Sequence, residues 1–303
     1  MSGEGTRKSD QYLDPRELSK ISRLEIRARL IVEGFISGVH KSPYHGASVE
    51  FAEHREYVPG DDIRHIDWKV YGRSDRYYIK QYEEETNLRT QIVLDSSESM
   101  NFGSHAMTKL DYGRTLAAAL AFLILKQRDA VGGFVFDAGI RTQVPVSSNP
   151  THLRNLIGIF ADEPGRDATD LGEVLARVGD RVKNRSLIIL ITDLFDEVDK
   201  IRMGLRRLRH DGHEVMLFHL MDPQELHFPF QRMTLFEGLE GYQDLLADPN
   251  SLREAYLEEV RGFVNQVKKS CRNNRVDYVL VDTSQRFDVV MTEFLARRSG
   301  AMR

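Results

Sequence analysis

From residue 91 onward, short apolar runs alternate with longer segments whose apolar positions recur at helical spacing. The short runs predict strands, and the longer segments predict helices that cross from one strand to the next. Continuous apolar strands joined by such helices predict an α/β fold, a doubly wound, mostly parallel sheet covered on both faces. We expect strands at 91–94, 131–136, 141–146, 186–192, 214–220 and 276–281, and helices at 109–126, 151–160, 170–182, 199–210, 251–273 and 288–298.

The pattern before residue 41 predicts a polar tail followed by one amphipathic helix, together spanning residues 1–40. Asp14 suits the N-cap and Pro15 the first helical position. Apolar residues then follow at helical spacing from Leu18 to Phe35, and Gly38 is a suitable stop.

Residues 41–90 have a different pattern, in which short segments of alternating apolar and polar residues flank the turn at Pro59-Gly60. We expect a β-rich extension that packs on the main domain, residues 91–303. Residues 223–250 also interrupt the strand–helix alternation, and we interpret them as an insertion or a hairpin edge.

Composition narrows the class of protein. The chain has 303 residues, 41% hydrophobic and 29% charged, with a formal net charge of -4. This composition fits a large core, and the absence of a basic excess argues against nucleic acid as partner. The single cysteine, Cys271, rules out an internal disulfide. The start lacks a signal-peptide pattern, and the longest apolar run, residues 116–125, is too short to span a membrane, so we expect a cytoplasmic protein without a membrane span.

Two predicted core strands end in aspartate, Asp95 and Asp193. Ligands of open α/β sheets lie outside the carboxyl ends of the strands, where these aspartates stand. The first strand continues as Asp-x-Ser-x-Ser, with serines at positions 97 and 99. Carboxylate and hydroxyl oxygens at alternate positions of a tight loop suit Mg²⁺ or Mn²⁺.

This arrangement resembles the metal-ion-dependent adhesion site of the von Willebrand factor A family. The site of that family also uses a threonine from a later loop, which matches Thr169 in the segment Gly165–Leu171. This segment lacks the usual second glycine, and Leu194, after Asp193, replaces a glycine that is frequent in the family. The resemblance implies a magnesium site made of Asp95, Ser97, Ser99, Thr169 and Asp193.

A second resemblance concerns the segments Glu50-Phe51, Arg55–Tyr57, Pro59–Arg64 and Ile66–Trp68. They look like the hallmark block of one bacterial group of von Willebrand A-like proteins, encoded beside MoxR-type AAA+ ATPases. The resemblance implies a MoxR-type ATPase as partner. The candidate partner surface comprises Arg55, Asp61, Asp62, Arg64, Asp67 and Trp68.

Each assignment has a structural alternative. Asp95, Ser97 and Ser99 could form a helix-capping loop, and Thr169 could be the N-cap of the next helix. The hallmark block could be a salt-bridged hairpin that closes one edge of the sheet.

The function that we favour is a binding module, not an enzyme, in which magnesium bridges the chain to a carboxylate on its partner. The alternative is a magnesium-dependent phosphotransferase or phosphatase with Asp95 as phosphoryl acceptor. Haloacid dehalogenase-like enzymes would need a second aspartate at position 97, which is serine, and the chain lacks a phosphate-binding Gly-x-x-x-x-Gly-Lys loop. A third interpretation is a scaffold whose site never holds metal.

Overall fold

The computed structural model describes residues 13–39, 54–56, 77–80, 89–165, 170–238 and 243–301. The chain divides into two compact units, one formed by Met1–Gly38 with Leu88–Arg303 and the other by Val39–Asn87. In the smaller unit, β1 (His54–Glu56) pairs antiparallel with β2 (Tyr78–Lys80). The expectation that residues 41–90 pack on the main domain stays a prediction.

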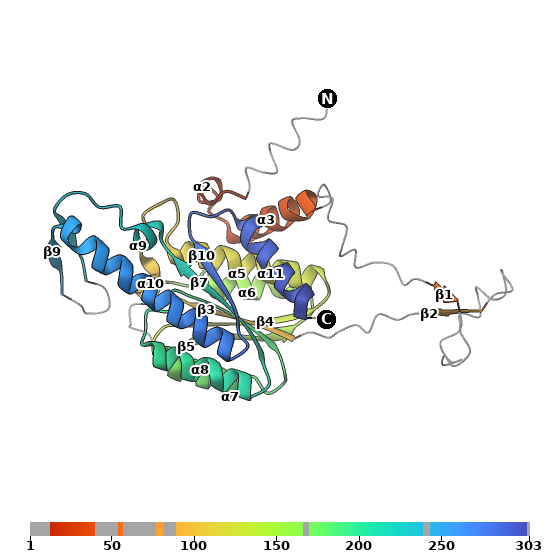
Figure 1. The fold of residues 1–303 in the computed structure, drawn as a ribbon. Helices are drawn as coiled ribbons and strands as arrows, with labels where there is room; N and C mark the ends of the chain where they lie inside the picture. Colours follow the sequence, from red (N-terminus) through yellow and green to blue (C-terminus); the bar gives the residue numbers. More distant parts are fainter. Residues whose placement is uncertain are drawn as a thin grey trace, which may run out of the picture. The chain divides into compact units, whose positions relative to one another are not determined.

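The larger unit is built on a six-stranded, mostly parallel sheet in the order β10-β7-β6-β3-β4-β5 (Figure 1). Every neighbouring pair is parallel except β4 and β5, which are antiparallel. The predicted α/β, doubly wound sheet is therefore confirmed. The strands are β3 (Arg89–Asp95), β4 (Ala130–Phe136), β5 (Ile140–Ser147), β6 (Leu187–Thr192), β7 (Glu214–Met221) and β10 (Asp277–Asp282).

Helices cover both faces of the sheet because successive strand residues bury their side chains on opposite sides. In β3, Ile92 and Leu94 join the core beneath α3, α5, α6 and α11, whereas Val93 joins the core beneath α7, α8 and α10. The helices are α3 (Leu24–Val39), α5 (Lys109–Lys126), α6 (His152–Phe160), α7 (Leu171–Arg181), α8 (Val198–His210), α10 (Pro249–Asn273) and α11 (Phe287–Ala301).

The strand order reverses between β3 and β6. From β3 the chain proceeds outward through β4 and β5, then returns to β6 on the other side of β3 and proceeds through β7 to β10. Because β3 and β6 are parallel neighbours, with Leu94 opposite Ile191, their carboxyl ends meet at this switch point.

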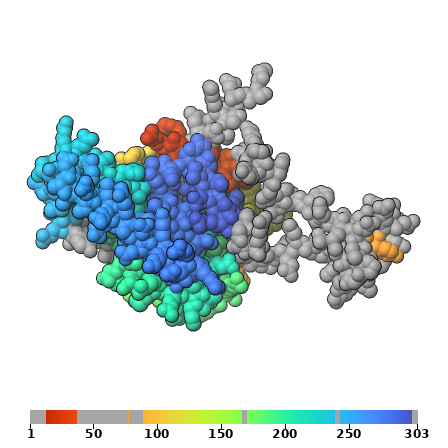
Figure 2. Space-filling model, in the orientation of Figure 1, coloured from red at the N-terminus to blue at the C-terminus, as the bar shows by residue number. Residues whose placement is uncertain are grey.

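The outermost strand β10 is covered from both sides. Helix α10 contacts it from one face of the sheet and α11 from the other. Figure 2 shows the blue surfaces of these two helices side by side. Strand β10 therefore contributes to the cores on both faces, through Val279 and Val281 on one and Tyr278 on the other.

The single helix predicted from Asp14 to Gly38 is wrong, because the structure contains two helices. Asp14 caps the short α2 (Pro15–Leu18) as expected, by accepting the N–H of Arg16. The chain then breaks before α3 because the Arg27 guanidinium donates to the carbonyl oxygens of Ser19 and Ile21. A side chain thus satisfies carbonyls that a continuous helix would bond through its backbone.

The segment expected to be an insertion or hairpin edge contains a short helix and a hairpin. Helix α9 (Pro223–His227) follows β7, and β8 (Thr234–Phe236) pairs antiparallel with β9 (Leu245–Ala247). Phe228, Phe230 and Tyr256 form an aromatic cluster with Phe236 that supports this hairpin.

Within the parts of the chain that the structure describes, we find no helix whose length and apolar character would let it cross a membrane.

Candidate metal-binding site

Asp95 and Asp193 lie at the carboxyl ends of the neighbouring strands β3 and β6, as the sequence predicts. The two strand ends are joined directly, because the Thr192 hydroxyl donates to Asp95 Oδ2 at 2.6 Å. Both aspartates are buried, with 1% of Asp95 and 7% of Asp193 exposed.

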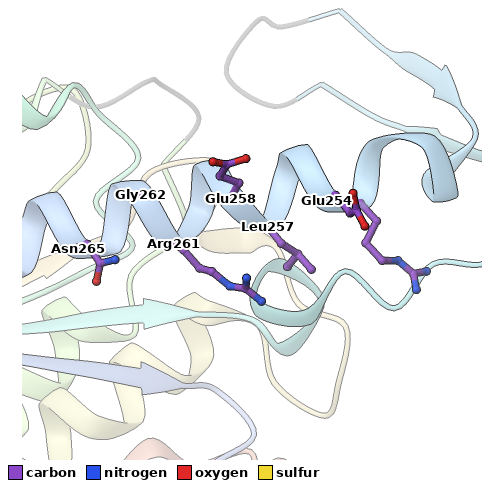
Figure 3. A pocket seen from close by; sticks show the side chains of 7 residues that line it. Glu254, Leu257, Glu258, Arg261, Gly262 and Asn265 are labelled. Atoms are coloured by element: carbon purple, nitrogen blue, oxygen red, sulfur yellow. The ribbon is translucent and has the colours of Figure 1, made fainter.

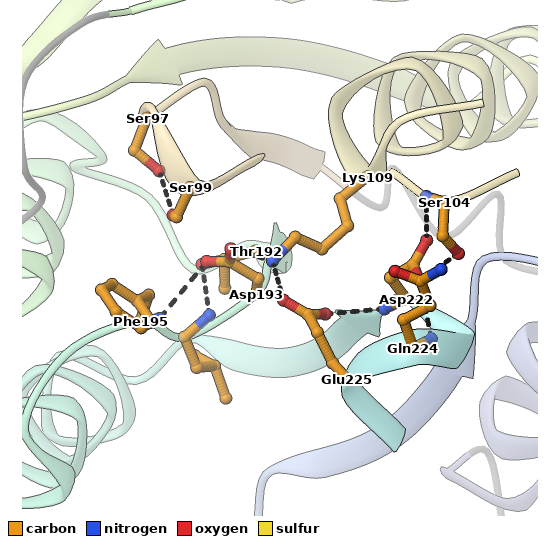
Figure 4. Close-up of polar contacts among 11 residues, drawn as sticks. Ser97, Ser99, Ser104, Lys109, Thr192, Asp193, Phe195, Asp222, Gln224 and Glu225 are labelled. Atoms are coloured by element: carbon orange, nitrogen blue, oxygen red, sulfur yellow. Dashed lines mark hydrogen bonds and ion pairs between the residues drawn. The ribbon is translucent and has the colours of Figure 1, made fainter. Parts of the chain in front are cut away.

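The loop after β3 is organised around the Asp95 carboxylate. Asp95 Oδ1 accepts the N–H of Ser97 at 2.9 Å, which closes a tight turn, and the hydroxyls of Ser97 and Ser99 lie 3.2 Å apart (Figure 4). Both serines are buried. The following long helix, α5, is capped by Thr108. The short 3-10 helix that begins in the loop, Ser99–Asn101, has no side-chain cap either, so the helix-capping alternative for this loop is wrong.

Burial raises the pKa of Asp95 to about 7, and the negative charge of Asp193 adds to the rise. Hydrogen bonds from Thr192 and Ser97 oppose it by stabilising the ionised form. A nearby cation would favour the ionised form of Asp95.

Asp193 stands at a strained turn. Its Oδ1 accepts the N–H of Phe195 at 3.3 Å, and the intervening Leu194 adopts a positive φ of 58°. Left-handed backbone is costly for a residue other than glycine, so this position would suit glycine. The Leu194 N–H donates to the Thr192 hydroxyl at 3.0 Å, so the turn also orients the Asp95 partner.

Lys109 places a positive charge beside the two aspartates. Its Nζ lies 2.7 Å from Asp193 Oδ2 and 2.6 Å from Glu225 Oε1 (Figure 4). Burial lowers the pKa of Lys109, but the charges of Asp193 and Glu225 outweigh it and hold that pKa above its ordinary value. No motif in the sequence points to Lys109 or Glu225 as members of this site.

His219 supports Asp193 from behind. Its Nδ1 lies 2.7 Å from the Tyr278 hydroxyl, and the ring also contacts the Asp193 backbone. Burial lowers the pKa of His219 to about 4, so the ring is neutral at ordinary pH. It therefore holds the turn without adding charge to the site.

The threonine of the predicted set, Thr169, lies outside the described residues. The described chain ends before it at Gly165 and resumes after it at Asp170. Gly165 donates its N–H to Ser96 O at 2.7 Å, and a Cβ there would lie 2.8 Å from that oxygen, so only glycine allows this approach. The N-cap of α7 is Asp170, which accepts the N–H of Glu173, so the alternative assignment of Thr169 as this cap is wrong.

The predicted partner surface is described only at Arg55, whose backbone lies in β1. The other members, Asp61, Asp62, Arg64, Asp67 and Trp68, lie outside the described residues. Their role stays a prediction.

The donors fit a hard divalent cation. Asp95, Ser97, Ser99 and Asp193 offer only carboxylate and hydroxyl oxygens, the ligands that magnesium and manganese prefer. Asp193 Oδ2 is buried and has no hydrogen bond of good geometry among the described residues, its contact with Lys109 being an ion pair. The described residues contain no group of three or more His, Cys, Asp or Glu placed to hold a metal, so the set depends on its hydroxyls.

A separate open groove of about 660 Å³ runs along α10 (Figure 3). The described residues that line it all come from that one helix, and none belongs to the site above. We therefore assign it no ligand. The residues that line the groove are Arg253, Glu254, Leu257, Glu258, Arg261, Gly262 and Asn265.

Three of the solved structures that are similar to this chain illustrate the likeness. BatB from Bacteroides thetaiotaomicron is 17% identical with a TM-score of 0.47, covering 70% of this chain and 99% of that one. An aerotolerance-related membrane protein from Bacteroides fragilis is 17% identical with a TM-score of 0.46, covering 68% and 97%. The SpRpn10 VWA domain is 11% identical with a TM-score of 0.37, covering 66% and 91%.

Comparison of sequences gives relatives that match along nearly the whole chain. A protein of Mycobacterium bovis and two of Mycobacterium tuberculosis, each called an uncharacterized protein, are 25% identical over 295 residues. Each match covers 95% of this chain and 92% of the relative. The family model described as "Protein of unknown function DUF58" matches residues 53–263, well over half of the chain, and the chain belongs to that family.

Proposed function

We propose that the chain is a protein-interaction module that binds Mg²⁺ or Mn²⁺ through Asp95, Ser97, Ser99, Asp193 and Thr169. The observation that carries the proposal is the pair of buried aspartates on adjacent strand ends, with two buried serine hydroxyls in the same loop. When bound, the metal ion supplies a positive centre to which a partner's aspartate or glutamate can bind. The chain's own residues orient the donors and exclude water.

The geometry favours binding over phosphoryl transfer. As a phosphoryl acceptor Asp95 would need to be accessible to a substrate and to have a second carboxylate nearby in the loop as acid and base. Asp95 is 1% exposed, and position 97 is serine. We therefore keep the magnesium-dependent phosphotransferase or phosphatase only as the alternative that an activity screen would detect.

The partner class follows from the resemblance of residues 50–68 to the MoxR-associated group. We propose a MoxR-type AAA+ ATPase, or another protein that presents an acidic residue, as the bound partner. The metal site explains why such a partner needs a carboxylate, because a hard cation binds oxygen anions preferentially.

Asp95→Asn and Asp193→Asn test the metal site. Magnesium at a hundred times its dissociation constant should stabilise the wild type by about 2.7 kcal/mol, and either substitution should remove most of this gain. Thermal melts with magnesium and with EDTA measure it. The matched control is Asp199→Asn, because the Asp199 side chain is 74% exposed and pairs only weakly with Arg202.

The same variants test the partner. Wild type and Asp199→Asn should capture the ATPase in magnesium and release it in EDTA, whereas Asp95→Asn should not capture it. An unchanged magnesium response in Asp95→Asn would refute the site. Absence of any magnesium or manganese response in the wild type would favour the scaffold interpretation.

A further inference from the structure

Lys109 is not one of the proposed metal ligands, but its buried ammonium contacts one of them, Asp193. Lys109 is the first residue of α5, and its side chain is 3% exposed. A cation at this end of a helix faces the positive end of the helix dipole and is unfavourable there. The carboxylates of Asp193 and Glu225, each within 2.7 Å, compensate for both the dipole and the loss of water.

Glu225 is fixed independently of Lys109. Its second oxygen, Oε2, accepts the N–H of Asp222 at 2.7 Å and completes the capping box of α9. The Asp222 carboxylate in turn accepts the N–H and the hydroxyl of Ser104, at 2.8 and 2.5 Å (Figure 4). Lys109 therefore bridges one carboxylate that the fold holds rigidly and one that belongs to the metal site.

A buried ammonium and a divalent cation at the same carboxylate repel each other, because both are positively charged. The repulsion is strong in a buried site, where little solvent screens it. In the metal-free protein Lys109 neutralises Asp193 and stabilises the fold. When the ion binds, Asp193 must serve both cations or release Lys109 to Glu225. The strength of the Lys109–Glu225 contact then determines how easily Asp193 is released.

We propose, resting on the metal site of the proposed function, that Lys109 is a resident counter-cation that competes with the divalent ion for Asp193, and that Glu225 holds its ammonium when the ion binds. A purely structural ion pair would differ. It would stabilise the fold with and without metal and leave the metal affinity unchanged.

Lys109→Met and Glu225→Gln distinguish these cases because they should act in opposite directions. Lys109→Met should lower the dissociation constant for magnesium about ten-fold, since the competing charge is gone, and should lower the melting temperature in EDTA. Glu225→Gln should raise the dissociation constant several-fold, because Lys109 then has only Asp193 as an anionic partner. Calorimetric titration of the full chain with magnesium, and then with manganese, measures both.

The double variant shows whether Glu225 acts through Lys109. In the Lys109→Met background, Glu225→Gln should change the dissociation constant less than two-fold, because there is no ammonium left to hold. An undiminished effect there would mean that Glu225 acts directly on the ion and would overturn the relay. The control is Lys126→Met, which removes the same charge from the exposed far end of α5 and should match the wild type.

The outcomes separate the two proposals. A wild type that binds neither ion overturns the metal site and the inference with it. A wild type that binds, with Lys109→Met unchanged or weaker, overturns only the inference. If Lys109→Met does not fold without metal, Lys109→Gln and Glu225→Gln carry the same test, and the inference fails unless their dissociation constants shift in opposite directions.

Discussion

Leu194 combines a left-handed backbone with a fully buried side chain. Its φ of 58° costs about 1 kcal/mol for a residue with a Cβ, whereas full burial of a leucine side chain contributes about 1.5–3 kcal/mol. The free energy gained by burial exceeds the cost of the backbone conformation, and the side chain packs into the core shared with α7 and α8. This is why leucine is stable at a position whose backbone suits glycine.

Comparison of Leu194→Gly with Leu194→Ala tests this balance. Both lose the buried side chain and should be destabilised by about 2–5 kcal/mol. Glycine accepts the left-handed backbone, so Leu194→Gly should be about 1 kcal/mol more stable than Leu194→Ala, the reverse of the usual order in regular structure. Urea unfolding measures the difference. Alanine being the more stable would show that the backbone relaxes.

At the scale of elements, the hydrophobic pattern predicted the strands and crossover helices because each buries a face of regular period. It failed at Ser19–Arg23, where apolar spacing continues through a break that one side chain, that of Arg27, maintains. The period of apolar residues predicts which face of an element is buried. It does not predict that a side chain, and not a backbone N–H, will donate to a carbonyl oxygen.

The packing around two helical glycines predicts that replacing each by alanine will change the stability in opposite directions. A Cβ on Gly204 of α8 would lie 2.8 Å from Leu175 Cδ1 of α7, whereas a Cβ on Gly262 of α10 meets nothing within 4 Å. Gly204→Ala should therefore destabilise by about 1–3 kcal/mol, and Gly262→Ala should stabilise by about 0.5–1 kcal/mol. Urea unfolding checks both. If both substitutions changed the free energy of unfolding in the same direction, the close packing of α7 on α8 would be contradicted.

At the scale of the whole molecule, the candidate site is assembled from both halves of the sheet. Asp95 and Lys109 come from the half that begins at β3, and Asp193 and Glu225 come from the half that begins at β6. The aspartates could be predicted because parallel strands end at one edge of the sheet. The Lys109 bridge could not, because no local pattern relates residues 109, 193 and 225, although Asp222-Pro223 with Glu225 is a recognisable capping box.

His213 couples the stability of the whole molecule to pH. It precedes β7, is 1% exposed, and neither ring nitrogen has a hydrogen bond of good geometry among the described residues. Burial lowers the pKa of His213, although the charge of Asp211 and a contact with the Val182 backbone oppose this, and the Arg209 side chain donates to the His213 backbone oxygen. The unfolded chain therefore binds a proton more readily than the folded one below the ordinary histidine pKa of about 6.5.

Because the folded pKa is depressed, His213 costs no stability at pH 8 and removes stability as the pH falls through about 6.5. His213→Leu should abolish this loss, so its free energy of unfolding should rise relative to the wild type by at most about 1.4 kcal/mol per pH unit between pH 7 and 5. Urea unfolding in EDTA at several pH values measures the difference, in which the contributions of other groups, Asp95 included, cancel. The control His227→Gln, at the exposed end of α9, should follow the wild type. Parallel curves for wild type and His213→Leu would mean that the buried ring is protonated in the folded protein at no cost.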